Sequence, residues 1–480
     1  MVDIQHGESL MKLRNIGTKL ETLEFYSKVS PVDSENIYQV PLSRNPEIVD
    51  VFNNASTRKK NLENEGVFGR SVILENVIGR LIEKRSEIVN LVIKETGKSR
   101  RLSEGEFDAA ILFGKSLLGL ARFQDGITMP STNPKKLVYE KRIPFGIAGL
   151  IVSYNTPMPN YAWKVFPSFL SGNISILKPS PHTSGSAQLF AEAFESEDVP
   201  EFSVCLIHGD GETGKILCNQ DLDLMSFTGS YDVGIEIQKS TSPKMRKNIF
   251  ELGGNNCLII NKSANLYKAV DEVLNSAFSN AGQRCAAGSR VILNKEIADS
   301  TLKIIKEKLS NLKVGSDEDS FLGPVIDVSA ASRYNEFLAA CKANNLTISK
   351  SDTNTNLNEL YLYPALVEGF DEKNPLFAKE LFAPILRVAI FESKEEALNL
   401  ANNSKYALTA AVWSNELEQI DFYLKNLSAG LININGPTHG AEFQFPFGGI
   451  GHSGNGSKEV GVQCLDQYSH HKLVTITHHG

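Results

Sequence analysis

Apolar residues repeat at helical spacing over residues 70–94, with charged residues between them. The apolar face of this segment consists of Val72, Ile73, Val77, Ile78, Leu81, Ile82, Ile88 and Val92. The spacing predicts one long helix. Gly97, which follows Glu95 and Thr96, is typical of a helix C-terminus.

Further along the chain, short apolar runs alternate with helical segments. Five of these runs predict buried strands, at residues 147–152, 174–177, 204–207, 224–227 and 257–260. Residues 184–194 and 231–239 predict helices between them. This alternation is typical of an α/β fold with a Rossmann-like, doubly wound parallel sheet.

A second α/β stretch begins after Gly253-Gly254 and continues to about residue 435. It contains predicted strands near 289–293, 385–391 and 430–434, and no low-complexity linker or solenoid repeat interrupts it. The tail from 467 to 477 is β-prone at 473–476. Because an unpaired terminal strand promotes aggregation, we expect it to complete a sheet, either in the same chain or in another subunit.

The composition is that of a soluble globular protein. At 480 residues the chain suggests two to four domains, and 41% of its residues are hydrophobic while 22% are charged. A net charge of −7 argues against nucleic acid or membrane as the principal partner. Residues 1–20 contain no apolar core of signal-peptide length, and no run approaches the roughly 20 apolar residues of a membrane-spanning helix.

The cysteines are widely separated and form no CxxC pair. They are Cys205, Cys218, Cys257, Cys285, Cys341 and Cys464. This spacing argues against a disulfide framework or a zinc site, so no metal is expected and a reducing cytoplasm fits best. In that setting a single cysteine is a candidate nucleophile.

Three residues carry chemistry that could act together. Cys285 follows a glycine-containing turn and fits either a nucleophile or a small buried side chain. Glu251 ends an apparent strand before Gly253-Gly254, and it fits either a buried general base or a surface glutamate. Asn155 lies just beyond the strand at 147–152, and it fits either an oxyanion donor or a turn residue.

Two glycine-rich segments are candidates for binding a nucleotide. Residues 209–214 match GxGxxG after a strand, but no acidic residue ends the next strand, so a simple flexible turn fits as well. Residues 227–230 form a strand, a tight turn and a helix start. Free amides at that helix start would suit a pyrophosphate, although Ser230 also fits an ordinary N-cap.

Seven motifs occur in the order found in the aldehyde dehydrogenase superfamily, which the chain resembles from about Val51 to its C-terminus. They are Tyr154-Asn155-Thr156-Pro157, Gly172-Asn173 with Lys178-Pro179-Ser180, Phe227-Thr228-Gly229-Ser230, Glu251-Leu252-Gly253-Gly254, Gly282-Gln283-Arg284-Cys285, Lys379-Glu380-Leu381-Phe382-Ala383-Pro384, and residues 446–454.

The resemblance implies NAD(P)-dependent oxidation of an aldehyde to a carboxylic acid. Cys285 would form a thiohemiacetal and then a thioester, with Asn155 and the Cys285 backbone N–H holding the oxyanion. Glu251 would activate the water that releases the acid. Its presence favours this hydrolytic branch over a coenzyme A-acylating enzyme. A catalytically silent relative acting as a structural or binding protein is a further alternative.

The resemblance also implies the cofactor contacts. Lys178 would hold the adenine ribose, Ser230 the pyrophosphate and Glu380 the nicotinamide ribose. The other expected contacts are Ser180, Gly211, Phe227, Gly229, Val233, Leu252 and Phe382. Many NAD-preferring members carry a glutamate where this chain has Pro181, so we expect NAD only slightly ahead of NADP.

Substrate selection is expected in residues 436–445 and around Asn155 and Cys285. Arg284 is a candidate to grip a carboxylate or phosphate on the aldehyde, or it is structural. His439 and Phe445 are further candidates for substrate contact, and His439 fits a loop histidine better than a catalytic base.

The expected architecture has three parts. A cofactor domain would comprise 1–122 and 143–253, a catalytic domain 254–466, and an oligomerisation element 123–142 with 467–480. By family resemblance the protein would be a homodimer or homotetramer acting on a small aldehyde.

Overall fold

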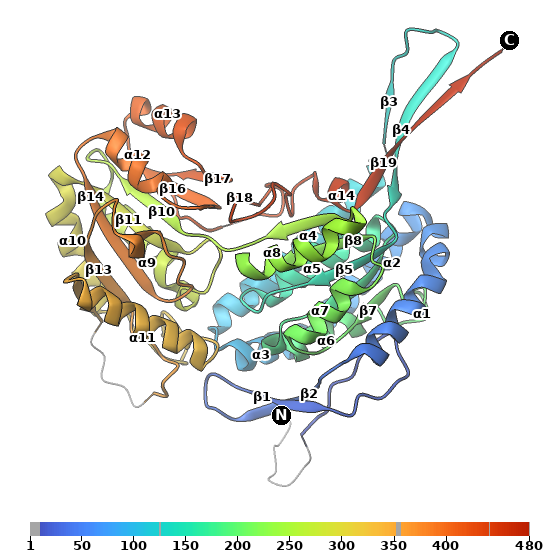
Figure 1. The fold of residues 1–480 in the computed structure, drawn as a ribbon, viewed down its shortest axis with the longest axis horizontal. Helices are drawn as coiled ribbons and strands as arrows, with labels where there is room; N and C mark the ends of the chain where they lie inside the picture. Colours follow the sequence, from blue (N-terminus) through green and yellow to red (C-terminus); the bar gives the residue numbers. More distant parts are fainter. Residues whose placement is uncertain (1–9, 124–125, 352–356, 441, 480) are drawn as a thin grey trace.

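The computed structural model describes residues 10–123, 126–351, 357–440 and 442–479. It contains two α/β lobes side by side and an arm that projects away from both (Figure 1). The predictions for residues 1–9 lie outside the described residues. No helix in the described ranges is both long and apolar enough to cross a membrane.

The first lobe is built on a five-stranded parallel sheet with the order β7-β6-β5-β8-β9. Its strands are β5 (Ile147–Ile151), β6 (Ile174–Lys178), β7 (Val204–Leu206), β8 (Leu224–Thr228) and β9 (Lys247–Glu251). The chain runs outward from β5 in one direction and from β8 in the other. This confirms the Rossmann-like prediction, and ligands bind such sheets where the order reverses, here beyond the ends of β5 and β8.

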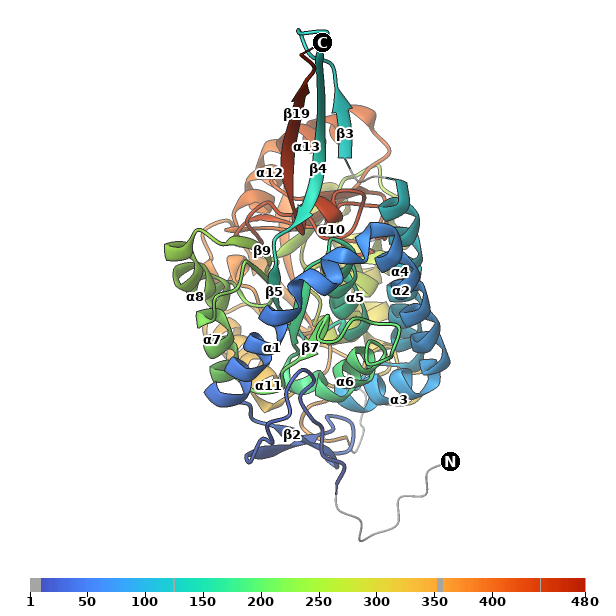
Figure 2. The same cartoon turned by 90° about the vertical axis from the view of Figure 1, so that its right-hand side faces the viewer.

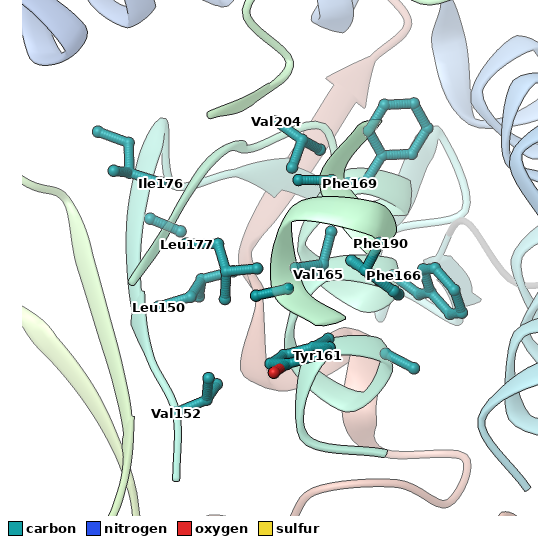
Figure 3. Close-up of a cluster of buried hydrophobic side chains, with 14 of the residues drawn as sticks. Leu150, Val152, Tyr161, Val165, Phe166, Phe169, Ile176, Leu177, Phe190 and Val204 are labelled. Atoms are coloured by element: carbon teal, nitrogen blue, oxygen red, sulfur yellow. The ribbon is translucent and has the colours of Figure 1, made fainter. Parts of the chain in front are cut away.

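Helices cover both faces of this sheet. One face carries α5 (Pro157–Leu170) and α6 (Ser184–Glu192), with α2 (Gly66–Glu83) and α4 (Arg100–Phe123) packed behind α5. The other face carries α1 (Asn45–Asn64), α7 (Gly211–Asn219) and α8 (Tyr231–Thr241). Figure 3 shows the core between β5, β6 and the α5 layer, where Leu150 and Leu177 face Val165 and where Phe166 points to the other side of α5.

The prediction of one helix over 70–94 was wrong. The segment forms α2 and α3 (Arg85–Thr96), which are separated at Lys84 (φ −87°, ψ 8°). Leu81 and Ile88, on either side of the break, are both buried and seven residues apart, as they would be in a continuous helix. The apolar period therefore could not reveal the break. Gly97 ends α3 with φ 72°, as predicted.

The second lobe contains a seven-stranded sheet with the order β12-β13-β14-β11-β10-β16-β17, parallel except for β12. Its strands are β10 (Asn256–Ile260), β11 (Gly288–Asn294), β12 (Thr347–Lys350), β13 (Ala365–Phe370), β14 (Ile385–Phe391), β16 (Thr409–Trp413) and β17 (Leu431–Ile434). The predicted strands at 257–260, 289–293, 385–391 and 430–434 all belong to it.

Alternate side chains of these strands enter two separate cores. Ile259 and Ile292 face the core shared with α11 (Val328–Ala343), α12 (Lys394–Asn402) and α13 (Leu417–Asn426). Leu258 and Val291 face α9 (Leu266–Phe278) and α10 (Lys295–Ser310). This alternation follows from the two-residue period of a strand buried on both faces.

The projecting arm is a three-stranded antiparallel sheet, β19-β4-β3 (Figures 1 and 2). Its strands are β3 (Gly126–Met129), β4 (Lys136–Pro144) and β19 (Ser469–Thr477). The predicted tail strand thus pairs with its own chain, from Ser469 opposite Pro144 to Thr477 opposite Lys136. The outer edge of β19 has no partner strand among the described residues.

Smaller elements complete the fold. A hairpin of β1 (Phe25–Val29) and β2 (Asn36–Pro41) lies beneath the first lobe, and β15 (Tyr406–Ala407) pairs with β18 (Ile450–Gly451). The short helix α14 (Cys464–Gln467) leads into β19.

Candidate active site

Two hollows flank the turn that follows β8, at the point where the strand order reverses. One, of about 410 Å³, is lined by residues of the turns after β5, β8 and β9, together with Cys285, Arg333 and residues 380–382. The other, of about 360 Å³, lies between α7 and α8 and includes Lys178, Gly211, Phe227 and Val233. The sequence-predicted catalytic and cofactor residues, except Glu251 and Ser180, are therefore divided between two neighbouring hollows.

Cys285 sits on a tightly constrained loop at the wall of the first hollow. Asn280, Ala281 and Gly282 precede it with φ of 57°, 53° and 70°, a left-handed run that is costly for the two residues carrying a Cβ. The Asn256 side-chain amide donates to the Cys285 carbonyl at 2.7 Å. A Cβ on Gly254 would lie 2.3 Å from that carbonyl oxygen, so glycine is required there.

Asn155 lies just beyond β5 and lines the same hollow as Cys285. The side chain is buried, and its carbonyl oxygen faces the Asn160 amide at 3.5 Å. The Asn155 backbone carbonyl accepts a hydrogen bond from Asn280 at 3.3 Å, which joins the two loops. Within the described ranges the Asn155 NH₂ group donates no hydrogen bond, so it can act as a donor in the hollow that Cys285 also lines, as an oxyanion site requires.

The resting thiol of Cys285 is held neutral. Burial raises its pKa to about 12, and the carboxyls of Glu251, Glu380 and Glu459 act in the same direction, while the Ala286 backbone N–H opposes them. A group that accepts the thiol proton is therefore needed before Cys285 can act as a nucleophile.

Glu251 ends β9 and is buried, as the general-base interpretation requires. Burial, and then the charge of Glu459, raise the pKa of Glu251 well above its usual range. Neither of its carboxyl oxygens has a hydrogen-bond partner among the described residues. The side chain lies against Gly448 rather than lining the hollow that contains Cys285.

A buried ion pair beside Glu251 was missed by the sequence analysis. Lys164, on α5, forms a salt bridge with Glu459 and donates to the Ser226 hydroxyl at 2.9 Å. The charge of Lys164 lowers the pKa of Glu251, whereas that of Glu459 raises it. The sequence does contain one signal for this ion pair. Lys164 lies in the otherwise apolar segment that forms α5, and a buried ammonium group requires an anionic partner.

Lys178, at the end of β6, lies in the second hollow. It is buried, and burial lowers the pKa of its amino group to about 8. The amino group donates to the carbonyls of Pro179 at 3.0 Å and Gly209 at 3.1 Å. It is thus fixed at the wall of the hollow, where the resemblance requires a donor for ribose hydroxyls.

The N-termini of α7 and α8 differ in their capacity to bind an anion. Asp210 caps α7 by accepting from the N–H groups of Glu212 and Thr213, so two amides of this helix start are already taken, and the Arg44 guanidinium beside the loop is paired with the same carboxylate at 3.1 Å. Ser230 stands at the N-cap position of α8 but makes no side-chain capping bond. The α8 terminus, and not the α7 terminus, therefore fits a pyrophosphate.

Glu380 and Phe382 face the first hollow with Gly229 and Leu252. The Glu380 carboxylate accepts from the Gly254 N–H at 2.9 Å, and a Cβ on Gly253 would lie 2.2 Å from its oxygens. Burial raises the pKa of Glu380. These residues fit the nicotinamide half of a dinucleotide, and those of the second hollow fit the adenosine half.

Ser180 lines neither hollow. Its hydroxyl accepts from the His182 N–H and caps the short turn after β6. Its cofactor role remains a prediction without a contact that supports it.

The three candidate substrate residues do not line the first hollow either. Arg284 is half-buried next to Cys285 in the sequence, and it donates to the Ser279 hydroxyl at 2.9 Å. Burial, and then the charge of Arg284, lower the pKa of His439 to about 4, so these two side chains lie within electrostatic reach of each other. The Phe445 side chain is 44% exposed.

Arg333 was also missed by the sequence analysis. It extends from α11 to the first hollow and donates to the Ser329 hydroxyl at 2.8 Å. No motif surrounds it, because it lies on the exposed face of an ordinary amphipathic helix.

The sequence profile described as the aldehyde dehydrogenase family matches residues 18–474. Among curated proteins, the chain is 30% identical over 459 residues to 2,5-dioxopentanoate dehydrogenase of Saccharolobus solfataricus, covering 94% of this chain and 96% of the relative. It is 31% identical over 459 residues to lactaldehyde dehydrogenase of Methanococcus aeolicus, covering 93% and 96%.

Solved structures agree with these matches. Betaine aldehyde dehydrogenase of Staphylococcus aureus in complex with NAD+ superposes with a TM-score of 0.92 at 26% identity, covering 98% of this chain and 96% of that one. Lactaldehyde dehydrogenase of Escherichia coli gives a TM-score of 0.93 at 25% identity, covering 98% and 100%.

Proposed function

Because this chain belongs to the aldehyde dehydrogenase family, we propose that it oxidises an aldehyde to a carboxylic acid through Cys285, Asn155 and Glu251. The observation that carries the proposal is the shared hollow of Cys285, Asn155 and Glu380, at the sheet edge where cofactors bind. The alternatives are a coenzyme A-acylating enzyme and a silent relative.

The residues divide the reaction as follows. Cys285 gives its thiol proton to solvent water in the hollow and its sulfur adds to the aldehyde carbon, while the Asn155 amide and the Cys285 backbone N–H hold the oxyanion. A bound nicotinamide cofactor supplies the acceptor to which the aldehyde hydrogen leaves as hydride. A thioester on Cys285 remains.

Glu251 completes the cycle as a general base. Its carboxylate takes a proton from water as that water adds to the thioester carbon, the C–S bond breaks, and the proton passes from Glu251 to the leaving sulfur, which releases the acid and restores the Cys285 thiol. A raised pKa suits this task, because a base whose pKa approaches the working pH both exists in ionised form and accepts a proton readily. Since Glu251 lies against Gly448, its side chain must turn toward Cys285 during deacylation.

The first test is reduced-cofactor formation with neutral, aromatic and anionic aldehydes, with NAD and NADP separately. Cys285→Ala should abolish turnover, whereas Cys341→Ala, which removes a buried thiol on α11, should retain it. A product found only as a coenzyme A thioester would establish the acylating alternative. Absence of turnover together with absence of cofactor-dependent labelling of Cys285 would establish the silent one.

For the substrate, we propose an aldehyde that carries an anionic group. Arg284 adjoins Cys285 in the sequence, its guanidinium is partly shielded from solvent, and it has no carboxylate salt bridge within the described ranges. The nearby Glu106 carboxylate forms its salt bridge with Lys98, which is buried, and not with Arg284. A guanidinium that is partly shielded from solvent favours a carboxylate or phosphate.

Arg284→Gln should therefore raise the KM for anionic aldehydes by about 10- to 100-fold, the range expected for a charge-assisted hydrogen bond. The KM for neutral aldehydes should change little. Equal losses for both classes would assign Arg284 a structural role. His439 and Phe445 remain proposed substrate contacts. Each can be tested by comparing the KM of its variant for anionic and for neutral aldehydes.

For the cofactor, we propose a slight preference for NAD over NADP. Lys178, Gly211, Phe227 and Val233 would contact the adenosine half. Pro181 carries no charge to repel a 2′-phosphate, and its carbonyl accepts from the Tyr26 hydroxyl at 3.1 Å. Comparable kcat/KM values for the two cofactors would support the proposal, and a hundredfold difference would contradict it.

The domain boundaries given above, a cytoplasmic location and a dimeric or tetrameric state are also proposed. The six cysteines are all free, as in a reducing compartment. The unpaired edge of β19 suits a strand from a second copy. Leu473→Lys on β19 should reduce the mass measured by light scattering, and Leu417→Lys, at an exposed position on α13, should not.

A further inference from the structure

A third hollow, of about 770 Å³, lies where the β1–β2 hairpin meets the second lobe. Its lining comes from β1 and the residues after it, from the turn after β6, and from residues 326–328 and 358–360 of the second lobe. Figure 1 shows the hairpin at the lower edge of the molecule, and the Asn358 side chain joins it to the second lobe by donating to the Pro31 carbonyl at 3.2 Å. The hollow shares no lining residue with the two hollows of the candidate active site, so it is a separate site.

Lys28, on β1, turns its side chain toward this hollow. Side chains two residues apart on a strand point to the same side, and the Tyr26 hydroxyl, two residues earlier, donates to the Pro181 carbonyl at 3.1 Å. Lys28 is only 4% exposed, whereas Ser27 and Val29 on either side of it are exposed. The Lys28 amino group therefore lies on the inner side of β1, where the turn after β6 also lines the hollow.

The amino group of Lys28 has no hydrogen bond or ion pair in the part of the chain that the structure describes. Burial lowers its pKa to about 8, and the charges of Glu95 and Asp327 raise it. The group is thus still largely protonated at neutral pH. A buried ammonium group without a counter-ion is costly, so this one requires an anion.

Two carboxylates lie within electrostatic reach of Lys28, but neither forms an ion pair with it. One oxygen of Glu95 accepts from the Gly185 N–H at 2.8 Å. Asp327 accepts from the Ala330 N–H at 2.8 Å and pairs with the His182 ring at 3.3 Å. The space beside the ammonium group is therefore left to a ligand.

Most of the surface of the hollow is apolar. Val29, on β1, and Val328, at the start of α11, both line it and are 46% and 56% exposed. Glu359, a further acidic lining residue, is exposed, so water and salt screen its charge. A buried cation next to exposed apolar side chains fits a ligand that has an anionic head and an apolar body.

We propose that this hollow binds a carboxylate with a short apolar chain, whose carboxylate group pairs with Lys28 while its chain packs against Val29 and Val328. Inorganic phosphate satisfies the ammonium group but leaves the apolar walls in water, so a carboxylate with a chain fits better. The inference does not depend on the proposed aldehyde oxidation.

The direct test is calorimetric titration of the full-length protein with hexanoate. Lys28→Met keeps the length of the side chain and removes its charge, so the dissociation constant for hexanoate should rise about 10- to 100-fold, the range for loss of a hydrogen bond to a charged group. Lys28→Arg keeps the charge and should retain binding. The matched control is Lys268→Met, at an exposed position on α9, which should bind hexanoate as the unaltered protein does.

A second variant tests the hollow without altering the buried lysine. Val328→Trp places a larger side chain in the hollow from an exposed position, so the fold should be kept while hexanoate binding weakens. Hexylamine, which has the same chain and the opposite charge, should not bind.

Three results would overturn the proposal. They are equal hexanoate affinity in the unaltered protein and in Lys28→Met, binding of hexylamine as tight as that of hexanoate, and binding of inorganic phosphate that depends on Lys28 and is at least as tight as that of hexanoate. The last result would leave an anion site without selection for an apolar chain.

Discussion

Asn155→Ala separates the proposed chemistry from stability more cleanly than any other substitution in the site. The side chain makes one marginal contact, at 3.5 Å with Asn160, and the backbone carbonyl that binds Asn280 is kept in the variant. Loss of the side chain should therefore cost at most about 1 kcal/mol of unfolding free energy. Loss of an oxyanion donor costs far more in rate, about 2.7–4 kcal/mol, or 100- to 1,000-fold in kcat.

The assay is steady-state formation of reduced cofactor, with urea unfolding measured on the same preparations. Asn160→Ala is the opposite control, because the Asn160 amide donates to the Ser153 carbonyl at 3.0 Å and is buried. In Asn160→Ala the larger effect should be on the free energy of unfolding rather than on kcat. A loss of kcat below tenfold in Asn155→Ala, with a native unfolding curve, would refute the assignment of this amide to the oxyanion.

Three further outcomes are expected. Gly254→Ala should lower both the melting temperature and the turnover, because its Cβ would lie 2.3 Å from the Cys285 carbonyl oxygen; unchanged values would contradict this packing. The thioester hydrolysis rate, followed in single turnovers, should increase with pH along a limb above the usual range for a glutamic acid, because Glu251 must be ionised and its pKa is raised; a limb that persists in Glu251→Gln belongs to another group. Lys164→Met should cost about 3–5 kcal/mol in urea unfolding by leaving Glu459 buried without its partner, and a loss below 1 kcal/mol would indicate that Glu459 becomes neutral.

Much of the fold could be predicted from local pattern. Most strands near the middle of each sheet are short apolar runs buried on both faces, so positions such as residues 147–152 for β5 follow from hydrophobicity. The sheet-edge strand β12 (Thr-Ile-Ser-Lys) has no such run and was not predicted. The break at Lys84 could not be predicted, because two helices that bury Leu81 and Ile88 have the same apolar spacing as one. Tertiary packing, rather than local propensity, determines that break.

Some residues of the candidate site could likewise be predicted from local sequence, and others could not. Cys285, Asn155 and Glu251 follow strands or glycine-containing turns, which is a local signal. Lys164 and Glu459 are 295 residues apart in the chain, yet the charges of both act on the pKa of Glu251, whose side chain lies against Gly448. Such a cluster exists only after the two segments pack, so no spacing in the sequence indicates it.

The arm has a consequence for how the protein is made. Its central strand, β4, pairs with β19, and the contact between Glu140 and His471 joins residues 331 positions apart. During synthesis β4 emerges long before β19, and one of its edges stays unpaired until residues 469–477 have been made. A chain that stops before residue 469 therefore contains both sheets but leaves this edge of β4 open, so the arm can form only after both lobes have been synthesised.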